Sequence, residues 1–180
     1  MPKIIEPISD SQALVTLWLG GMARIDFQQG KLIKHFEKFC ALTRGILPIP
    51  NSTDVYIMCY GIPHGPGEIV RLNIETGKVT SRIPTGGSPR HVVALKDGTA
   101  LISNLNSGQI YHFDPATGKF LHRMYLGGGI NTIDVDPSGR FLFISQRELD
   151  LVSVVDTRTW KVVLEQMVGD YPTRLDVSYD

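Results

Sequence analysis

The stretch "DLVSVVDTRTWKVV", from Asp150 to Val163, recurs in looser form at three earlier places in the chain. The other copies read "QIYHFDPATGKFL" from Gln109, "EIVRLNIETGKVT" from Glu68 and "MARIDFQQGKLIK" from Met22. Each copy combines an alternating apolar and polar run, a turn, and a second run that begins at a lysine, which is the pattern of a β-hairpin. The copies therefore indicate repeated β-structure rather than a single mixed fold.

The spacing of the copies predicts a β-propeller. The turn lysines are Lys31, Lys78, Lys119 and Lys161, which lie 47, 41 and 42 residues apart. A four-stranded propeller blade takes about 40–45 residues. Before and after each hairpin the chain has a glycine-rich corner and two further short strands. We therefore expect an all-β propeller of four-stranded antiparallel blades, with about four repeats in this chain.

The four strands of each blade are expected at regular positions. The inner strand of each blade is predicted near 46–50, 91–95, 131–136 and 174–178, and the second strand near 13–18, 54–60, 99–104 and 140–145. The recurring phrase supplies the third and fourth strands. The repeat units then run roughly over 22–60, 68–104, 109–145 and 150–178, with an N-terminal strand at 13–18, all within one propeller domain spanning 1–180.

The two ends of the chain predict how the ring is completed. An inner strand at 174–178 and a second strand at 13–18 together make one blade, which would close a four-bladed ring and leave no open sheet edge. Alternatively, the chain forms part of a seven- or eight-bladed ring, completed by a second copy in a homodimer or by further sequence. The segment "PKIIEPIS" could also form an inner strand of its own.

The last repeat, "VSVVDTRTWKVVLEQMVGDYPTRLDVS", resembles the YVTN-type propeller repeat, and looser matches extend through residues 68–135. This resemblance implies a propeller of the kind found in surface-layer and periplasmic binding proteins and in lactonase-like enzymes. Most such relatives are made as exported precursors. A propeller hosts many functions, so the resemblance by itself assigns none.

The composition excludes several classes of protein. Lys and Arg number 18, as do Asp and Glu, so there is no basic excess for binding nucleic acid. No apolar run approaches the ~20 residues of a membrane span, and the first residues lack signal-peptide features. We expect a cytoplasmic protein if Met1 is the native start, and a periplasmic or extracellular one if the chain is a fragment or processed form. A bridge between Cys40 and Cys59 is conceivable, but two reduced, buried thiols are predicted.

A ligand site is expected where the inner strands begin, at the mouth of the central channel. The polar residues predicted to bind a ligand there are Arg44, Arg90, Asn104, Asn131, Arg147 and Arg174. Arginine side chains recognise carboxylate and phosphate groups through paired hydrogen bonds, so a small anionic ligand is the expected occupant. A protein partner bound by the same loops is the alternative. Channel-lining residues that only contact water would produce the same pattern.

Catalysis is the second hypothesis. His64 and His91 are weak candidates for catalytic residues, as proton carriers or metal ligands in a lactonase-like or lyase-like enzyme. The supporting acidic groups would be Glu68, Glu148 and Asp170. No HExxH, GxSxG or phosphate-binding loop is present. We expect no cofactor and no metal site, except a divalent metal under the enzyme hypothesis.

Four short polar residues recur at the end of the third strand of each repeat: Asp26, Asn73, Asp114 and Asp156. Because they occur in every unit, a structural role is predicted, in which each side chain accepts hydrogen bonds from the backbone of the following turn. The resulting functional hypothesis is a binding or interaction module. An enzyme at the channel mouth and a half-ring built for assembly are the alternatives.

Overall fold

The computed structural model describes residues 1–61 and 66–178, which contain sixteen β-strands and no helix. The first sheet comprises β1 (Pro2–Pro7), β2 (Gln12–Leu17), β3 (Met22–Asp26) and β4 (Lys31–Phe36), and the second comprises β5 (Thr43–Pro48), β6 (Asp54–Cys59), β7 (Glu68–Asn73) and β8 (Val79–Pro84). The third comprises β9 (Pro89–Ala94), β10 (Ala100–Asn104), β11 (Gln109–Asp114) and β12 (Lys119–Tyr125). The fourth comprises β13 (Ile130–Val135), β14 (Phe141–Gln146), β15 (Leu151–Asp156) and β16 (Lys161–Met167).

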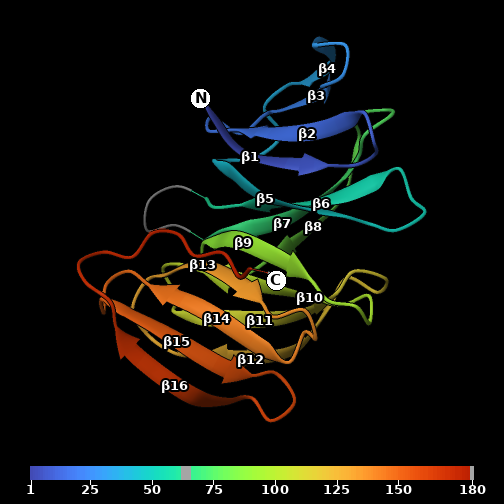
Figure 1. Cartoon of the computed structure of the whole chain (residues 1–180). Coiled ribbons are helices and arrows are strands. Elements are labelled where there is room, and N and C mark those ends of the chain that lie inside the picture. The colour runs from blue at the N-terminus through green and yellow to red at the C-terminus, as the bar shows by residue number, and fades with distance from the viewer. Residues whose placement is uncertain (62–65, 179–180) are drawn as a thin grey trace. The chain divides into compact units, whose positions relative to one another are not determined.

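Every sheet is a four-stranded antiparallel meander in which neighbours in sequence are neighbours in space (Figure 1). The repeated phrase of the sequence forms the last two strands of each sheet, β3–β4, β7–β8, β11–β12 and β15–β16. This is the blade architecture of a propeller, and it confirms the predicted fold class. Among the described residues, the chain has no helix of the length and hydrophobicity that a membrane crossing requires.

The first sheet corrects the expected closure of the ring. The segment Pro2–Pro7 forms β1 and pairs with β2, with Ile5 opposite Val15. Residues 174–178 form no strand, and the Val177 amide donates a hydrogen bond to the Asp134 carboxylate instead. Because β1 already occupies the inner edge of β2, that edge has no room for a strand from the C-terminal segment. The predicted exchange of strands between the two ends is therefore wrong, and "PKIIEPIS" supplies its own inner strand.

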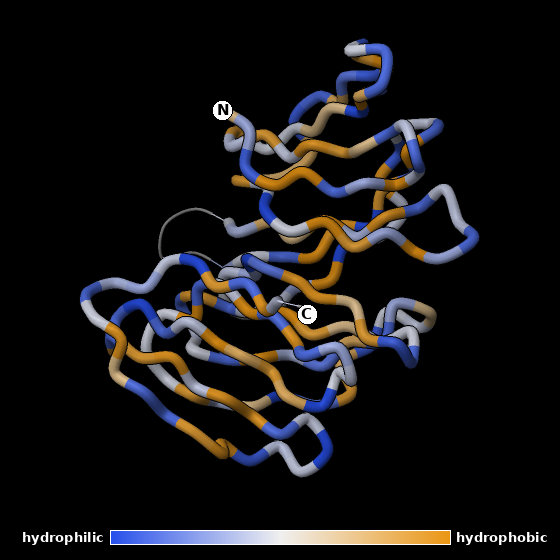
Figure 2. Tube along the Cα trace, viewed as in Figure 1, coloured by the Kyte–Doolittle hydropathy of each residue, from blue (hydrophilic) through white to orange (hydrophobic). Residues whose placement is uncertain are grey.

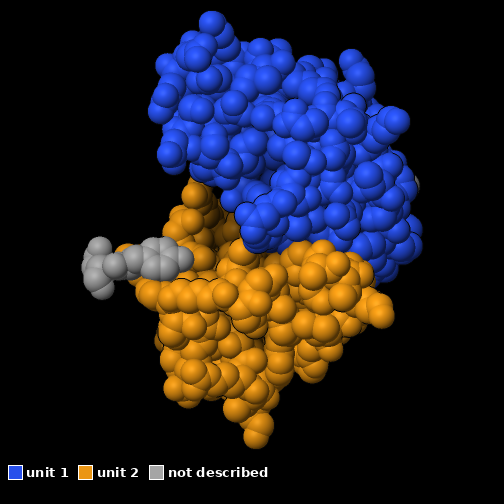
Figure 3. Space-filling model, turned by 90° about the vertical axis from the view of Figure 1, so that its right-hand side faces the viewer, with its two compact units in different colours: residues 1–89 blue, residues 90–180 orange. Residues whose placement is uncertain are grey.

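Two compact units divide the described chain, Met1–Pro89 and Arg90–Asp180 (Figure 3). Each unit contains two sheets with an apolar layer between them. In the first unit this layer includes Leu14, Ile57 and Val70, and in the second it includes Leu101 and Ile144. Figure 2 shows the apolar residues concentrated along the strands and the polar ones in the turns, as expected for alternating strands packed face to face.

The recurring turn residues have the predicted structural role. Gln29 donates its amide hydrogen to Asp26, Thr76 to Asn73, and Ala116 to Asp114. In the last blade the amides of Arg158 and Thr159 both donate to Asp156. A short carboxylate or amide at this position thus closes the turn of each blade.

Acid is expected to weaken the last of these turns. The amide of Arg158 and the Arg140 guanidinium, 3.0 Å from Asp156 Oδ2, hold the pKa of that carboxyl below its ordinary value. The stabilisation is therefore fully present above the unfolded pKa of about 4 and is lost as the pH falls through the lower folded pKa. We expect the free energy of unfolding, measured in urea from about pH 7 to about pH 3, to decrease less in Asp156→Asn than in the wild type. Asp170→Asn, an exposed carboxylate in the same unit, should retain the wild-type slope, and equal slopes in all three proteins would contradict the prediction.

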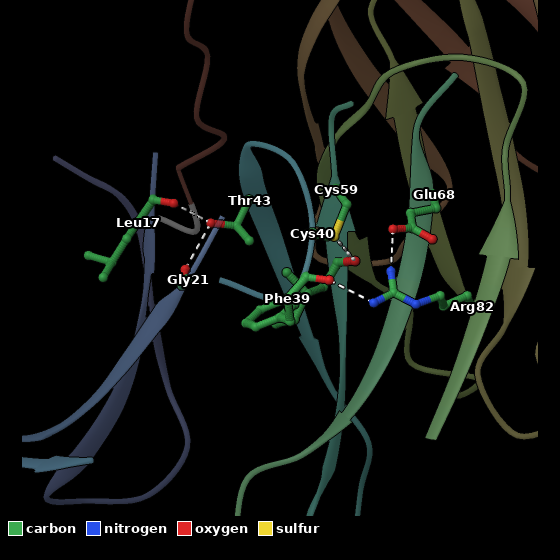
Figure 4. The surroundings of a disulfide bond; sticks show 9 residues. Leu17, Gly21, Phe39, Cys40, Thr43, Cys59, Glu68 and Arg82 are labelled. Carbon is green, nitrogen blue, oxygen red and sulfur yellow. Dashed lines mark hydrogen bonds and ion pairs between the residues drawn. A yellow bond between two sulfur atoms is a disulfide. The ribbon is translucent and has the colours of Figure 1, made fainter. Parts of the chain in front are cut away.

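The two cysteines form a disulfide, with Cα atoms 6.1 Å apart, so the prediction of reduced thiols is wrong. The connection after β4 turns back against the turn between β2 and β3, because the Phe39 amide donates to the Gly20 carbonyl. Arg82 donates to the Phe39 carbonyl and also forms an ion pair with Glu68 (Figure 4). These contacts hold Cys40 against the end of β6, where Cys59 lies.

Candidate functional site

The inner strands begin with β-bulges, at the positions where the sequence predicts ligand-binding side chains. The register shifts between Pro2 and Ile5 in β1, and between Thr43 and Ile46 in β5. The same shift occurs between Ile130 and Ile133 in β13. A bulge inserts an extra residue and redirects its side chain, and bulges are common beside functional sites. Arg44 and Asn131 are both bulge residues.

A hydroxyl group on the neighbouring strand holds the start of the inner strand in three of the sheets. The Ile4 amide donates to Thr16 Oγ1 at 3.1 Å, the His91 amide to Ser103 Oγ at 3.0 Å, and the Thr132 amide to Ser145 Oγ at 3.0 Å. All three hydroxyl-bearing residues are buried. They fix the backbone from which the candidate side chains project. These hydroxyl-bearing residues were not among those predicted from the sequence, although "VT" in β2 and "IS" in β10 and β14 recur at matching positions.

In the first unit, Arg44 is held by aromatic rings. Its guanidinium carbon lies 3.9 Å from the centre of the Trp18 ring and 5.4 Å from that of Tyr60. The Lys3 ammonium lies 4.5 Å from the Trp18 ring centre. Arg44 is buried, so these stacked contacts take place with little water around them, where cation–π attraction is stronger. The arrangement rigidifies a positive charge at the start of β5.

In the second unit, Asn131 and Arg147 lie at the same end of the β13–β14 pair, because Ile130 is opposite Gln146. The Asn131 amide donates to the Thr173 carbonyl at 2.7 Å. The Asn131 Oδ1 and Arg147 Nε atoms are also buried, and neither has a hydrogen-bond partner among the described residues. The Arg147 guanidinium lies 5.9 Å from the ring of Tyr171. The segment around 171–173 thus contacts both residues.

Asn104 is separate from the contacts of Asn131 and Arg147. It ends β10, is fully buried, and neither atom of its side-chain amide has a hydrogen-bond partner in the described part of the chain. The preceding residue, Ser103, contacts the Asn131 carbonyl at 3.4 Å. Successive side chains of a strand point to opposite faces, so Asn104 points away from β13.

A backbone hydrogen bond fixes the tautomer that the neutral form of His91, on β9, adopts. Its Nδ1 atom lies 3.0 Å from the Ile133 carbonyl oxygen, which can only accept, so Nδ1 carries the hydrogen and Nε2 carries the lone pair. Burial lowers the pKa of His91, while the bond to Ile133 and the charge of Asp134 oppose the shift. Of the neighbouring candidates, Arg90 is half-buried beside it on β9, and the exposed Arg174 forms an ion pair with Asp176 at 3.0 Å.

The candidate metal ligands do not form a cluster. Among the residues that the structure describes, no three His, Cys, Asp or Glu side chains are grouped to bind one ion. Glu68 pairs with Arg82, and Glu148 lies 3.6 Å from Arg147. Asp170 is exposed. His64 lies outside the described residues.

Comparison with known proteins supports the fold and leaves the family open. No protein-family model matches the chain. Antigen Lp49 of Leptospira interrogans is 26% identical over an alignment 196 positions long, which covers 98% of this chain and 42% of that protein. The chain thus spans less than half the length of this relative.

Two solved structures have the same arrangement of strands. Hydrazine synthase from Kuenenia stuttgartiensis matches with a TM-score of 0.79 and 14% identity, covering 93% of this chain and 49% of that one. The Cps50 (Swd1) β-propeller domain from Myceliophteria thermophila matches with a TM-score of 0.71 and 9% identity, covering 94% of this chain and 56% of that one. At such identities the likeness establishes the β-propeller fold alone.

Proposed function

We propose that the chain is a binding module, and that its second unit binds a small molecule carrying a carboxylate next to a hydroxyl or amine. The observation that supports this is the pair of buried polar atoms, Asn131 Oδ1 and Arg147 Nε, without partners among the described residues. A buried polar group left without a hydrogen bond costs about 1–3 kcal/mol. Such groups are rare in proteins, and a ligand is one explanation for them.

The chemistry of the two atoms defines the ligand. Arg147 can only donate hydrogen bonds, so it calls for a carboxylate or another acceptor with negative charge. Asn131 already uses its amide nitrogen on Thr173, so its oxygen is left to accept from a hydroxyl or ammonium group. A 2-hydroxy acid, an amino acid or a sugar acid carries both groups a few ångströms apart. The ring of Tyr171 beside Arg147 would cover the apolar part of such a molecule.

Calorimetric titration with a panel of such acids tests the proposal. We expect at least one compound to bind saturably, and Arg147→Gln to weaken its affinity by at least about tenfold, or 1.4 kcal/mol. Arg158→Gln is the matched control, because Arg158 is an exposed arginine of the same unit in a turn between β15 and β16. Thermal unfolding of each variant verifies that it is folded. Saturable binding by no member of the panel, or equal affinity in Arg147→Gln and wild type, would contradict the proposal.

The same titration addresses the enzyme hypothesis. His91 keeps a lone pair on Nε2 in its neutral form, which is what a general base requires. Consumption of a bound acid or lactone by the wild type, with loss of turnover in His91→Gln, would indicate a lactonase-like or lyase-like enzyme. Binding without turnover would support the binding module.

The disulfide supports a proposal about compartment. Disulfides persist in oxidising compartments and are rare in the cytosol. The buried bridge between Cys40 and Cys59 therefore favours a periplasmic or extracellular location over the cytoplasmic one.

A further inference from the structure

Two histidines face each other across adjacent strands in the second unit, away from the residues considered above. His112 on β11 and His122 on β12 are directly opposite in the strand register. Directly opposed residues of an antiparallel pair have Cβ atoms about 4.5–5.5 Å apart. Trp160, from the turn between β15 and β16, contacts both imidazoles, with ring centroids 5.5 Å from His112 and 4.3 Å from His122. One indole thus holds both rings on the same face of the sheet.

The hydrogen bonds of His112 decide which nitrogen carries the lone pair. Thr99 Oγ1 donates its hydrogen to Asp97 Oδ1 at 2.6 Å, because an ionised carboxylate only accepts. The Thr99 oxygen, 2.8 Å from His112 Nε2, must then accept the Nε2 hydrogen. The neutral imidazole therefore keeps its lone pair on Nδ1. A metal-ligating histidine usually donates its other ring N–H to an acceptor that orients the ring, and the Thr99 hydroxyl, itself held by Asp97, is such an acceptor for His112.

Trp160 adds a separate indication. In the other three blades the corresponding turn position is glycine: Gly30, Gly77 and Gly118. Trp160 adopts the same left-handed conformation, with φ of 54°. This backbone conformation is unfavourable for a bulky residue, and such residues concentrate at functional sites. The strain is offset here by contacts with the two histidines.

We propose that His112 and His122 form a two-histidine binding site for a divalent transition metal, with copper(II) or nickel(II) the preferred ions. Imidazole nitrogen suits both ions, and copper(II) binds most strongly in the divalent series. A hollow of about 280 Å³ is lined by His112 and Trp160, so solvent can reach the His112 side of the proposed site. Lys96 and Arg158 also line this hollow. The Asp97 and Asp114 carboxylates interact electrostatically with His112, and their negative charge opposes the positive charge of these two side chains.

Tryptophan fluorescence provides a direct test with copper(II) chloride or nickel(II) chloride on the intact protein. Trp160 contacts the proposed site, whereas Trp18 lies in the first unit against Arg44 and Lys3. In a Trp18→Phe variant, where Trp160 is the remaining tryptophan, we expect copper(II) to quench the fluorescence saturably. Calorimetry should give a stoichiometry of one ion per chain. Quenching that remains after Trp160→Phe, with Trp18 intact, would report a different site.

Four substitutions separate a chelate from adventitious surface binding. His122→Asn and His112→Asn should each weaken copper(II) affinity at least about tenfold, whereas His35→Asn, which removes a histidine opposite Ala23, should leave it unchanged. Thr99→Val keeps the side-chain shape but removes the acceptor for His112 Nε2, and is expected to weaken binding about 10–100-fold. Equal affinity in wild type and His122→Asn would overturn the proposal, as would a loss of equal size in His35→Asn. Circular dichroism of each variant verifies that a lost signal is not lost folding.

Discussion

Replacing both Cys40 and Cys59 with serine is expected to lower the free energy of unfolding by about 3 kcal/mol. The bridge joins residues 19 apart in sequence, and closing a loop of that length removes a corresponding amount of entropy from the unfolded chain. Both cysteines are buried, at 8% and 1% exposure, so their hydroxyl replacements also have to leave water. The loss of stability in the double serine variant is therefore expected to be at least as large as the entropic contribution of the disulfide.

Urea unfolding with and without dithiothreitol measures this effect. The wild type should lose stability on reduction, while the double serine variant should be insensitive to the reductant. A Cys40→Ala/Cys59→Ala protein controls for the buried hydroxyls, because it removes the bridge without adding polar groups. A wild-type midpoint that does not move on reduction would contradict both the stabilising role of the bridge and the proposal of an oxidising compartment.

A methyl group added at Gly20 is expected to lower the free energy of unfolding by about 2–4 kcal/mol. The new Cβ would lie 1.8 Å from the Cys40 carbonyl oxygen, which is far inside contact distance. Gly20 also has a φ of 107°, a conformation that side chains rarely adopt. Its carbonyl accepts the Phe39 amide, so relieving the clash would displace the segment that carries Cys40.

Gly30→Ala is the matched control for Gly20→Ala. Gly30 has a φ of 62°, and an added Cβ there would meet no atom within 4 Å. Trp160 occupies the equivalent turn position at a φ of 54°, so a side chain fits there at the cost of the left-handed conformation. We expect Gly30→Ala to cost only about 1–2 kcal/mol, the penalty of the left-handed conformation. Equal urea midpoints for the two variants would show that the close approach of the added Cβ to the Cys40 carbonyl does not add to the loss of stability.

The blade architecture could be predicted from the sequence because its causes are local. Alternation specifies a strand within about five residues, and the polar residue at the end of the third strand specifies the turn that follows. Asp26, Asn73, Asp114 and Asp156 all accept the expected backbone hydrogen bonds. The predicted strand at 13–18 corresponds to β2, at Gln12–Leu17. Each of these features depends on residues that are neighbours in the chain.

The surroundings of the candidate binding residues could not be predicted from the sequence, because they come from distant segments. Arg44 and Asn131 were both expected at the starts of inner strands, but the sequence does not show that one stacks on Trp18 and the other contacts Thr173. The bulges that redirect these side chains also depend on strand pairing. The sequence positions thus identified both residues as candidates. Only the tertiary contacts show that the arginine stacks on aromatic rings, whereas the asparagine oxygen has no hydrogen-bond partner among the described residues.

By itself the sequence determined the repeat, the strands, the turns and hence the all-β propeller class. Only the tertiary structure decided that Pro2–Pro7 forms the inner strand of the first sheet, that Cys40 reaches Cys59, and that His112, His122 and Trp160 meet. The physical reason is the range of the interactions. Strand and turn preferences are set by residues a few positions apart, whereas these pairings depend on which of several compatible segments packs into each place, and that choice is made by the whole fold.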